Sequence, residues 1–123
     1  VIHATLTSKT TTLTATIKSK TAAVTEGKAV ETITGQRYKF VPTKTGTYYF
    51  YSVSEFPYDP RGYLYDENMT QLASNDNTLH KLTENRFDFC ISYNCEAGKT
   101  YYLTSNKGQY TLYISSVNPD TGK

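Results

Sequence analysis

Tyrosine is the residue type whose number and spacing point most directly to chemistry in this chain. Twelve of the 123 residues are tyrosine, and tryptophan is absent. A phenol ring is a rigid, flat surface with one polar tip, which suits recognition by stacking and hydrogen bonding. Tyrosines recur in the segments 46–53, 99–104 and 108–115. This pattern predicts binding rather than catalysis.

The segment 46–53 shows how a strand would present these rings. At a period of two residues, Tyr48 and Phe50 fall on one face, and Tyr49 and Tyr51 fall on the other. Three such segments suggest one sheet with an apolar inner face and a tyrosine-rich outer face. Sugar rings pack their C–H faces on aromatic rings, while polar side chains at nearby strand ends take the hydroxyl groups. The candidate ligand-binding residues are Tyr49, Tyr51, Tyr63, Tyr65, Tyr102, Tyr113, Arg61 and Lys107, with Asn106 and Gln109 as further polar groups.

An alternative remains for each of these tyrosines. Aromatic residues are common in strands, and outward tyrosines can serve only to stabilise cross-strand pairs or to cover a second layer. Of the candidates, Tyr49 and Tyr51 carry the clearest expectation. Replacing either one with alanine is expected to weaken ligand binding without unfolding the domain.

Residues suited to catalysis are sparse. His3 lies near the start of the chain and His80 in a polar loop, and no known nucleophile, zinc or phosphate-binding motif occurs. Asp59 with Asp66 or Glu67 could in principle form the carboxylate pair of a glycosidase. Solvated turn residues account for them more simply, so we expect no enzyme activity and no catalytic residue.

Metal and cofactor binding receive little support. The hard oxygen ligands that calcium prefers do occur in two turns, but the same residue types are ordinary turn formers. We therefore expect no cofactor and no metal site, with a structural calcium ion as the minor alternative. Its candidate ligands are Asp66, Glu67, Asn68, Asn75, Asp76 and Asn77.

Charge and cysteine content exclude some classes of partner. The net charge of +2 is too balanced for an electrostatic nucleic-acid surface, and no apolar run is as long as a membrane helix.

Cys90 and Cys95 would lie roughly 16 Å apart in extended chain, too far for a disulfide. We expect two reduced thiols, with Cys95 in the core, and a monomer that binds neither nucleic acid nor membrane.

The elements that must position these side chains are short strands. Apolar and polar residues alternate in the segments 12–18, 36–41 and 86–93, and residues 19–28 look like a turn or link. Gly46–Ser54 is expected to be the antiparallel partner of Gln36–Val41. In 86–93 the pattern places Phe87, Phe89, Ile91 and Tyr93 inward and Asp88, Cys90 and Ser92 outward.

Further short strands are expected at 29–33, 63–66, 71–74, 99–105 and 108–117. Eight to ten short strands without an amphipathic helix predict an all-β protein, an antiparallel β-sandwich of jelly-roll type. The whole of 1–117 is expected to be one module, and 118–123 a polar tail or linker.

Seven fragments in order resemble the bacterial pre-peptidase C-terminal (PPC) domains and related jelly-roll carbohydrate-binding modules. The resemblance covers about residues 36–115. It rests on Tyr38–Phe40, Gly46–Phe50, Gly62–Asn68, Gln71–Asp76, Phe87–Phe89, Glu96–Leu103 and Gly108–Ile114.

The resemblance implies a secreted, non-catalytic β-sandwich attached to a protease or a polysaccharide-degrading enzyme. It implies a buried thiol at Cys95. The usual acidic pair is Asp76-Asn77 here, so one carboxylate of an analogous calcium site is missing. The combined expectation is a carbohydrate-binding module of a secreted bacterial enzyme that degrades plant polysaccharides, its ligand being a β-glucan, hemicellulose or pectin. The partners are then the polysaccharide and a covalently linked catalytic module. The alternative is a PPC-like interaction, secretion or spacer domain without a glycan ligand.

Overall fold

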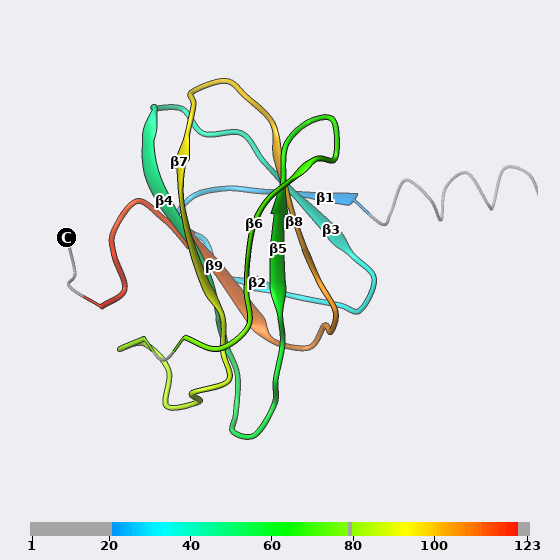
Figure 1. The fold of residues 1–123 in the computed structure, drawn as a ribbon, viewed down its shortest axis with the longest axis vertical. Helices are drawn as coiled ribbons and strands as arrows, with labels where there is room; N and C mark the ends of the chain where they lie inside the picture. The colour runs from blue at the N-terminus through cyan, green and yellow to red at the C-terminus, as the bar shows by residue number, and fades with distance from the viewer. Residues whose placement is uncertain (1–20, 79, 121–123) are drawn as a thin grey trace, which may run out of the picture.

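The protein is a sandwich of two β-sheets. The computed structural model describes residues 21–78 and 80–120, and this part of the chain contains nine strands and no helix. One sheet has five strands in the order β1-β3-β8-β5-β6, and the other has four in the order β2-β9-β4-β7 (Figure 1). The all-β sandwich expected from the sequence is therefore confirmed.

The five-stranded sheet carries its partly exposed tyrosines on two adjacent strands, β8 and β5. All of its neighbouring strands are antiparallel except β1 and β3, which are parallel. The strand bounds are β1 Thr21–Val24, β3 Arg37–Phe40, β8 Tyr101–Ser105, β5 Gly62–Tyr65 and β6 Gln71–Asn75.

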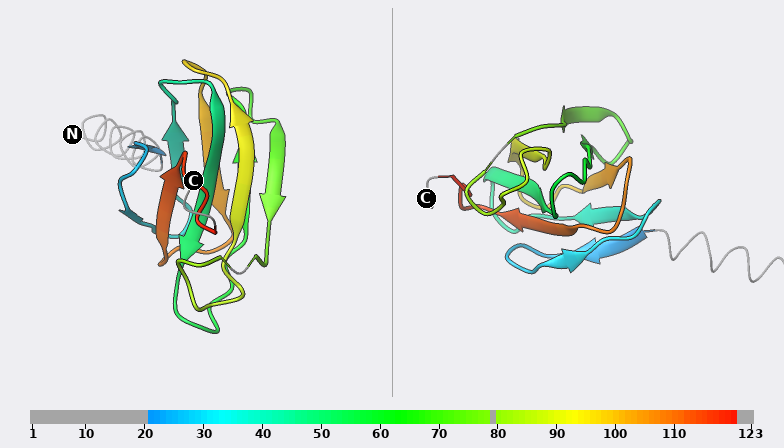
Figure 2. Two further views of the ribbon diagram at one scale, coloured as in Figure 1. Left: turned by 90° about the vertical axis from the view of Figure 1, so that its left-hand side faces the viewer. Right: turned by 90° about the horizontal axis from the view of Figure 1, so that it is seen from below.

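The four-stranded sheet is antiparallel throughout. Its longest strand, β4, lies between β9 and β7, and these three strands are seen side by side in Figure 2. The strand bounds are β2 Val30–Glu31, β9 Thr111–Ser115, β4 Gly46–Val53 and β7 Cys90–Cys95.

The core fills the space between the sheets with alternate residues of each strand. Phe40 from one sheet meets Phe50 from the other edge to face, with ring centroids 5.8 Å apart. Gly62 lies against the Phe89 ring, and a Cβ atom there would lie 2.5 Å from that ring. The lack of a side chain at Gly62 thus lets β5 lie close to the core, which fixes the position of Tyr63 on the outer side.

The expected pairing of the strands in 36–41 and 46–54 is wrong. β3 pairs with β1 and β8, whereas β4 lies in the other sheet. The expectation of one tyrosine-rich sheet is wrong for the same reason, because β4 and β9 belong to one sheet and β8 to the other. A strand is also present at Thr21–Val24, where a link was expected, and the expected strand at 12–18 lies outside the described residues.

The segment 76–89 differs most from expectation. The strand predicted from residue 86 begins at Cys90, and Asp88, expected outward, is fully buried. His80, expected in a polar loop, is only 1% exposed. Both side chains hold the loop against the four-stranded sheet, as described below.

Both cysteines are free, and Cys95 is buried, as predicted. Pro119 is buried and the Asp120 carboxylate accepts a hydrogen bond from the Lys81 amide at 3.1 Å, so the chain beyond β9 contacts the loop at 80–83. Within the described residues, no helix is long and apolar enough to cross a membrane.

Candidate functional site

The outer face of the five-stranded sheet carries three half-buried tyrosines. Tyr65 of β5 and Tyr102 of β8 are direct cross-strand partners, and Tyr63 lies two residues before Tyr65 on the same face. Side chains directly opposite on adjacent strands have Cβ atoms about 5 Å apart. The three phenol rings therefore form one patch, called here the open tyrosine face.

Cationic side chains lie over these rings. The Arg37 guanidinium carbon is 5.4 Å from the centre of the Tyr102 ring, and that of Arg61 is 5.5 Å from the centre of the Tyr63 ring. Lys39 is the direct partner of Tyr102 on β3 and is exposed. A cation over an aromatic face is attracted by the ring quadrupole, so these contacts hold the rings in defined positions.

Arg61 is part of a small polar cluster at one end of the open tyrosine face. Its guanidinium lies 3.5 Å from the Asp76 carboxylate, and its amide donates to the Asn106 side chain at 2.8 Å. Asp59 lies close by, and burial, together with the charge on Asp76, raises the pKa of the Asp59 carboxyl above its ordinary value of 3.8. The cluster fixes Arg61 in place, and Asp76 balances its charge.

The outer face of the four-stranded sheet has a different character. Tyr49 and Tyr113 are half-buried there, but Tyr51 is only 5% exposed. The Tyr51 ring stacks on Tyr113 at 5.3 Å and meets the His80 ring edge to face at 4.9 Å. The expectation that Tyr51 is accessible to a ligand is therefore wrong, because the His80 and Tyr113 rings cover it. We call this the capped face.

Hydrogen bonds to the buried Asp88 carboxylate and to His80 hold the loop 76–89 in place. The Asp88 carboxylate accepts hydrogen bonds from the Ser52 hydroxyl at 2.8 Å, the Ser54 amide at 3.0 Å and hydroxyl at 2.6 Å, and the Thr83 hydroxyl at 2.6 Å. The His80 Nε2 atom lies 2.9 Å from the Ser52 carbonyl oxygen. A buried carboxylate with four donors is a strong anchor, because each donor would otherwise lose its partner.

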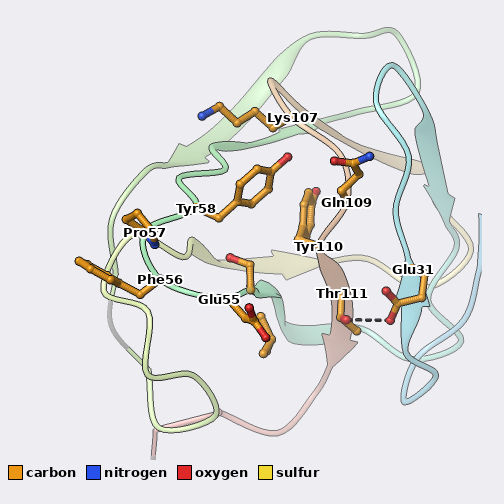
Figure 3. A pocket seen from close by; sticks show the side chains of 11 residues that line it. Glu31, Glu55, Phe56, Pro57, Tyr58, Lys107, Gln109, Tyr110 and Thr111 are labelled. Atoms are coloured by element: carbon orange, nitrogen blue, oxygen red, sulfur yellow. Dashed lines mark hydrogen bonds between the residues drawn. The ribbon is translucent and has the colours of Figure 1, made fainter.

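A groove opens beside the capped face, at the end of β2, β4 and β9. Its volume is about 620 Å³, within the usual range for small-ligand sites. In Figure 3 the Tyr58 and Tyr110 rings lie near its centre, and Phe56 points away from them. The lining residues are Glu31, Val53, Ser54, Glu55, Phe56, Pro57, Tyr58, Lys107, Gln109, Tyr110 and Thr111.

Much of the binding capacity of the groove is already used within the chain. The Lys107 ammonium lies 5.4 Å from the centre of the Tyr58 ring, and the Tyr58 hydroxyl donates to the Gly108 carbonyl. Glu31 accepts a hydrogen bond from the Thr111 hydroxyl at 2.7 Å. Tyr110 is 2% exposed. A cation over a ring is thus common to the groove and the open tyrosine face, but the groove has one partly exposed tyrosine, Tyr58, whereas the open tyrosine face has three.

The structure separates the residues predicted from the sequence into three places. Tyr63, Tyr65, Tyr102 and Arg61 come together on the open tyrosine face, Tyr49, Tyr51 and Tyr113 belong to the other sheet, and Lys107 borders the groove. Sequence reasoning missed Arg37 and Lys39 as members of the site. Their outward position was evident from the alternation, but their proximity to Tyr102 follows only from the pairing of β3 with β8.

The candidate metal ligands are spread over turns with structural roles. Asp66 Oδ1 accepts hydrogen bonds from the amides of Asn68 and Thr70, each at 2.9 Å, and so closes the turn between β5 and β6. Among residues 21–78 and 80–120, no three His, Cys, Asp or Glu side chains gather as a metal site. Calcium binding remains an untested prediction.

Comparison with known proteins supports the fold. No protein-family model matches the sequence, and no curated protein matches it either. A solved structure does match: the pre-peptidase C-terminal domain of a collagenase from Bacillus anthracis, with a TM-score of 0.57 and 15% identity. The match covers 76% of this chain and 93% of that domain. The resemblance predicted from the sequence is thus confirmed at the level of the fold, and the chain has the β-sandwich fold of a PPC domain.

Proposed function

We propose that this domain is a non-catalytic carbohydrate-binding module of a secreted bacterial enzyme that degrades plant polysaccharides. The observation that supports this best is the open tyrosine face. Tyr63, Tyr65 and Tyr102 lie together on a sheet surface, remain partly exposed, and have guanidinium groups over two of the rings. A flat, partly exposed aromatic surface with polar groups around it suits the face of an extended sugar chain.

The binding mode follows from this geometry. The C–H faces of sugar rings pack on the phenol rings, and the sugar hydroxyls exchange hydrogen bonds with phenol, guanidinium and amide groups at the border of the patch. Few groups contact any one sugar, so the affinity per site is weak. A weak module still concentrates a covalently linked enzyme at its substrate, because the linker raises the effective concentration of the catalytic site.

The test is affinity electrophoresis against β-glucan, xyloglucan, xylan, mannan and homogalacturonan. We expect retardation by at least one of them, and a loss of about tenfold in affinity for Tyr102→Ala, a typical cost for removing an aromatic anchor. Tyr49→Ala is the matched control, because it removes a half-buried tyrosine from the other sheet. Circular dichroism establishes that both variants are folded. Equal binding by Tyr102→Ala and the unaltered domain would move the site away from this face.

A protein-interaction, secretion or spacer domain is the second candidate. The shared fold with the C-terminal domain of a collagenase favours it, since that domain accompanies a protease. Such a domain would be retarded by none of the five polysaccharides. The same experiment therefore separates the two functions.

A further inference from the structure

We propose that the open tyrosine face selects an anionic polysaccharide whose charges are uronate carboxylates. This inference rests on the proposed function, because it narrows the ligand class of the same face. It depends on two cations, Arg37 and Lys39, whose charges are not balanced by the described part of the protein.

Arg37 and Lys39 lack carboxylate partners in the part of the chain that the structure describes. Within residues 21–78 and 80–120 the ion pairs are Arg61–Asp76 and Lys99–Glu96, so neither Arg37 nor Lys39 has a carboxylate partner there. The polar contact of Arg37 is its Nη1 atom to the Met69 sulfur at 3.4 Å, and thioether sulfur is a weak acceptor. Both cations are therefore available to an anion.

Lys39 begins a row of cross-strand partners that runs across the five-stranded sheet. Lys39, Tyr102, Tyr65 and Gln71 are successive cross-strand partners on β3, β8, β5 and β6. Three strand spacings of ~4.8 Å make this row about 14 Å long, which is longer than one sugar ring. A polysaccharide lying across the strands would thus meet a cation at one end and tyrosines along its middle.

The border of the row leaves the cations accessible. On β1 the partners of Arg37 and Lys39 are Thr21 and Ala23, whose short side chains cannot cover them. Arg37 is half-buried because it lies over Tyr102, whereas Lys39 is exposed. A sugar ring that reaches Tyr102 would therefore meet the Arg37 guanidinium over the phenol ring and the Lys39 ammonium beside it.

The charge of the ligand decides whether Arg37 and Lys39 are compensated when it binds. A neutral glycan would dehydrate both cations in part and return no opposite charge, whereas a carboxylate compensates them. The guanidinium fork of Arg37 matches the two oxygens of a carboxylate, and Lys39 adds a compact charge. The capped face lacks this feature, since its outward neighbours of Tyr49 are Ser92 and Ser115.

The experiment compares two forms of one polysaccharide, homogalacturonan, which differ in how many of their carboxylates are charged. De-esterified homogalacturonan carries free carboxylates, and highly methyl-esterified homogalacturonan carries few. We expect binding to the first, measured by isothermal titration calorimetry, to be at least about fivefold tighter than to the second. We also expect it to weaken when salt rises from about 0.01 M to about 0.1 M, where the screening length falls from ~30 Å to ~10 Å.

The variant Arg37→Gln/Lys39→Gln should weaken binding to the de-esterified polymer about fivefold, as two exposed ion pairs would predict. The control Lys81→Gln/Arg86→Gln removes one lysine and one arginine from the loop 76–89 on the other side of the sandwich, so its net charge is identical. We expect its affinity to be unchanged. Equal losses in both variants would overturn the assignment to this face.

Three other outcomes would overturn the inference in distinguishable ways. Equal binding to both forms of homogalacturonan, or binding to neutral glucan, xylan or mannan instead, would remove the carboxylate preference and leave the proposed function intact. Binding of dextran sulfate as tight as that of de-esterified homogalacturonan would show general attraction to polyanions. Failure to bind any polysaccharide would remove both the inference and the proposed function.

Discussion

The two outer faces of the sandwich carry three candidate tyrosines each and differ in what lies on top of them. On the open tyrosine face, Tyr63, Tyr65 and Tyr102 remain partly exposed, and arginine side chains lie over the rings of Tyr63 and Tyr102. On the capped face, a loop of the chain itself covers Tyr51 through His80.

This difference shows that a tyrosine pattern alone does not define a binding surface. Tyr51 and Tyr65 are both outward tyrosines on strands that have a neighbour on each side, yet one stabilises a loop and the other remains partly exposed. The distinction comes from Asp88, whose hydrogen bonds to Ser52 and Ser54 hold the loop that carries His80 over one sheet. On the open tyrosine face, arginine side chains rather than a loop lie over the rings.

The largest effect is expected when the anchor of the capped face is removed. Asp88→Ala would leave the buried Ser52 hydroxyl and the partly buried Ser54 and Thr83 donors without this acceptor, and we expect it to lower the free energy of unfolding by about 4 kcal/mol. Urea denaturation measures this value. Ser92→Ala, an exposed site on the same face, serves as the control and should change stability little. A loss below about 1 kcal/mol would mean that the loop is held by other contacts.

A slightly smaller effect is expected for Tyr51. Tyr51→Ala would remove a buried ring from between Tyr113 and His80 and lower the free energy of unfolding by about 3 kcal/mol, a typical cost for a buried aromatic ring. Tyr49→Ala, two residues earlier on β4 and half-buried, should cost about 1 kcal/mol or less. Equal stability of the two variants in thermal unfolding would contradict the contrast between covered and accessible tyrosines.

The stability of the protein is expected to depend on pH through Asp59, which lies at the end of the open tyrosine face. The pKa of Asp59 is raised in the folded protein, so its contribution to stability is present below the ordinary value of 3.8 and is lost as pH rises through the folded value. Asp59→Asn should therefore raise the melting temperature at pH 7 by a few degrees, about the effect of 1 kcal/mol or less. At pH 3 the variant and the unaltered protein should melt alike. A lower melting temperature at pH 7 would show that the Asp59 charge is stabilising.

A change in reactivity rather than in stability is expected at Cys90, which lies opposite Tyr51 on the capped face. Burial, and to a lesser extent the Asp120 charge, raises the pKa of this thiol to about 11. Alkylation of Cys90 at pH 8 should thus be slower than in the unfolded chain by about 100-fold, since each pKa unit reduces the thiolate fraction about tenfold. Asp88→Ala should speed the reaction if the protein stays folded, because the loop would open. Rapid alkylation of the unaltered protein would mean that the cap is already loose.

Much of the local structure was predictable because it depends on alternation within short segments. The strands at 63–66 and 71–74 are observed as β5 and β6, and the inward positions of Tyr48 and Phe50 are confirmed. Asp88 was predicted incorrectly because its neighbours Phe87 and Phe89 suggest a continuing strand. The segment is instead a loop whose conformation depends on Ser52 and Ser54, more than 30 residues away.

Only part of the candidate site could be predicted from the alternation of residues along each strand. The sequence by itself determined that Tyr63, Tyr65 and Tyr102 point away from a core, since a residue's side of a strand follows from its position in the chain. Only the tertiary structure decided that Tyr102 lies beside Lys39 and under Arg37, that Tyr51 is covered, and that the tyrosines divide between two sheets. Strand pairing and loop packing join residues far apart in sequence, and their free energies depend on the whole set of contacts rather than on any local pattern.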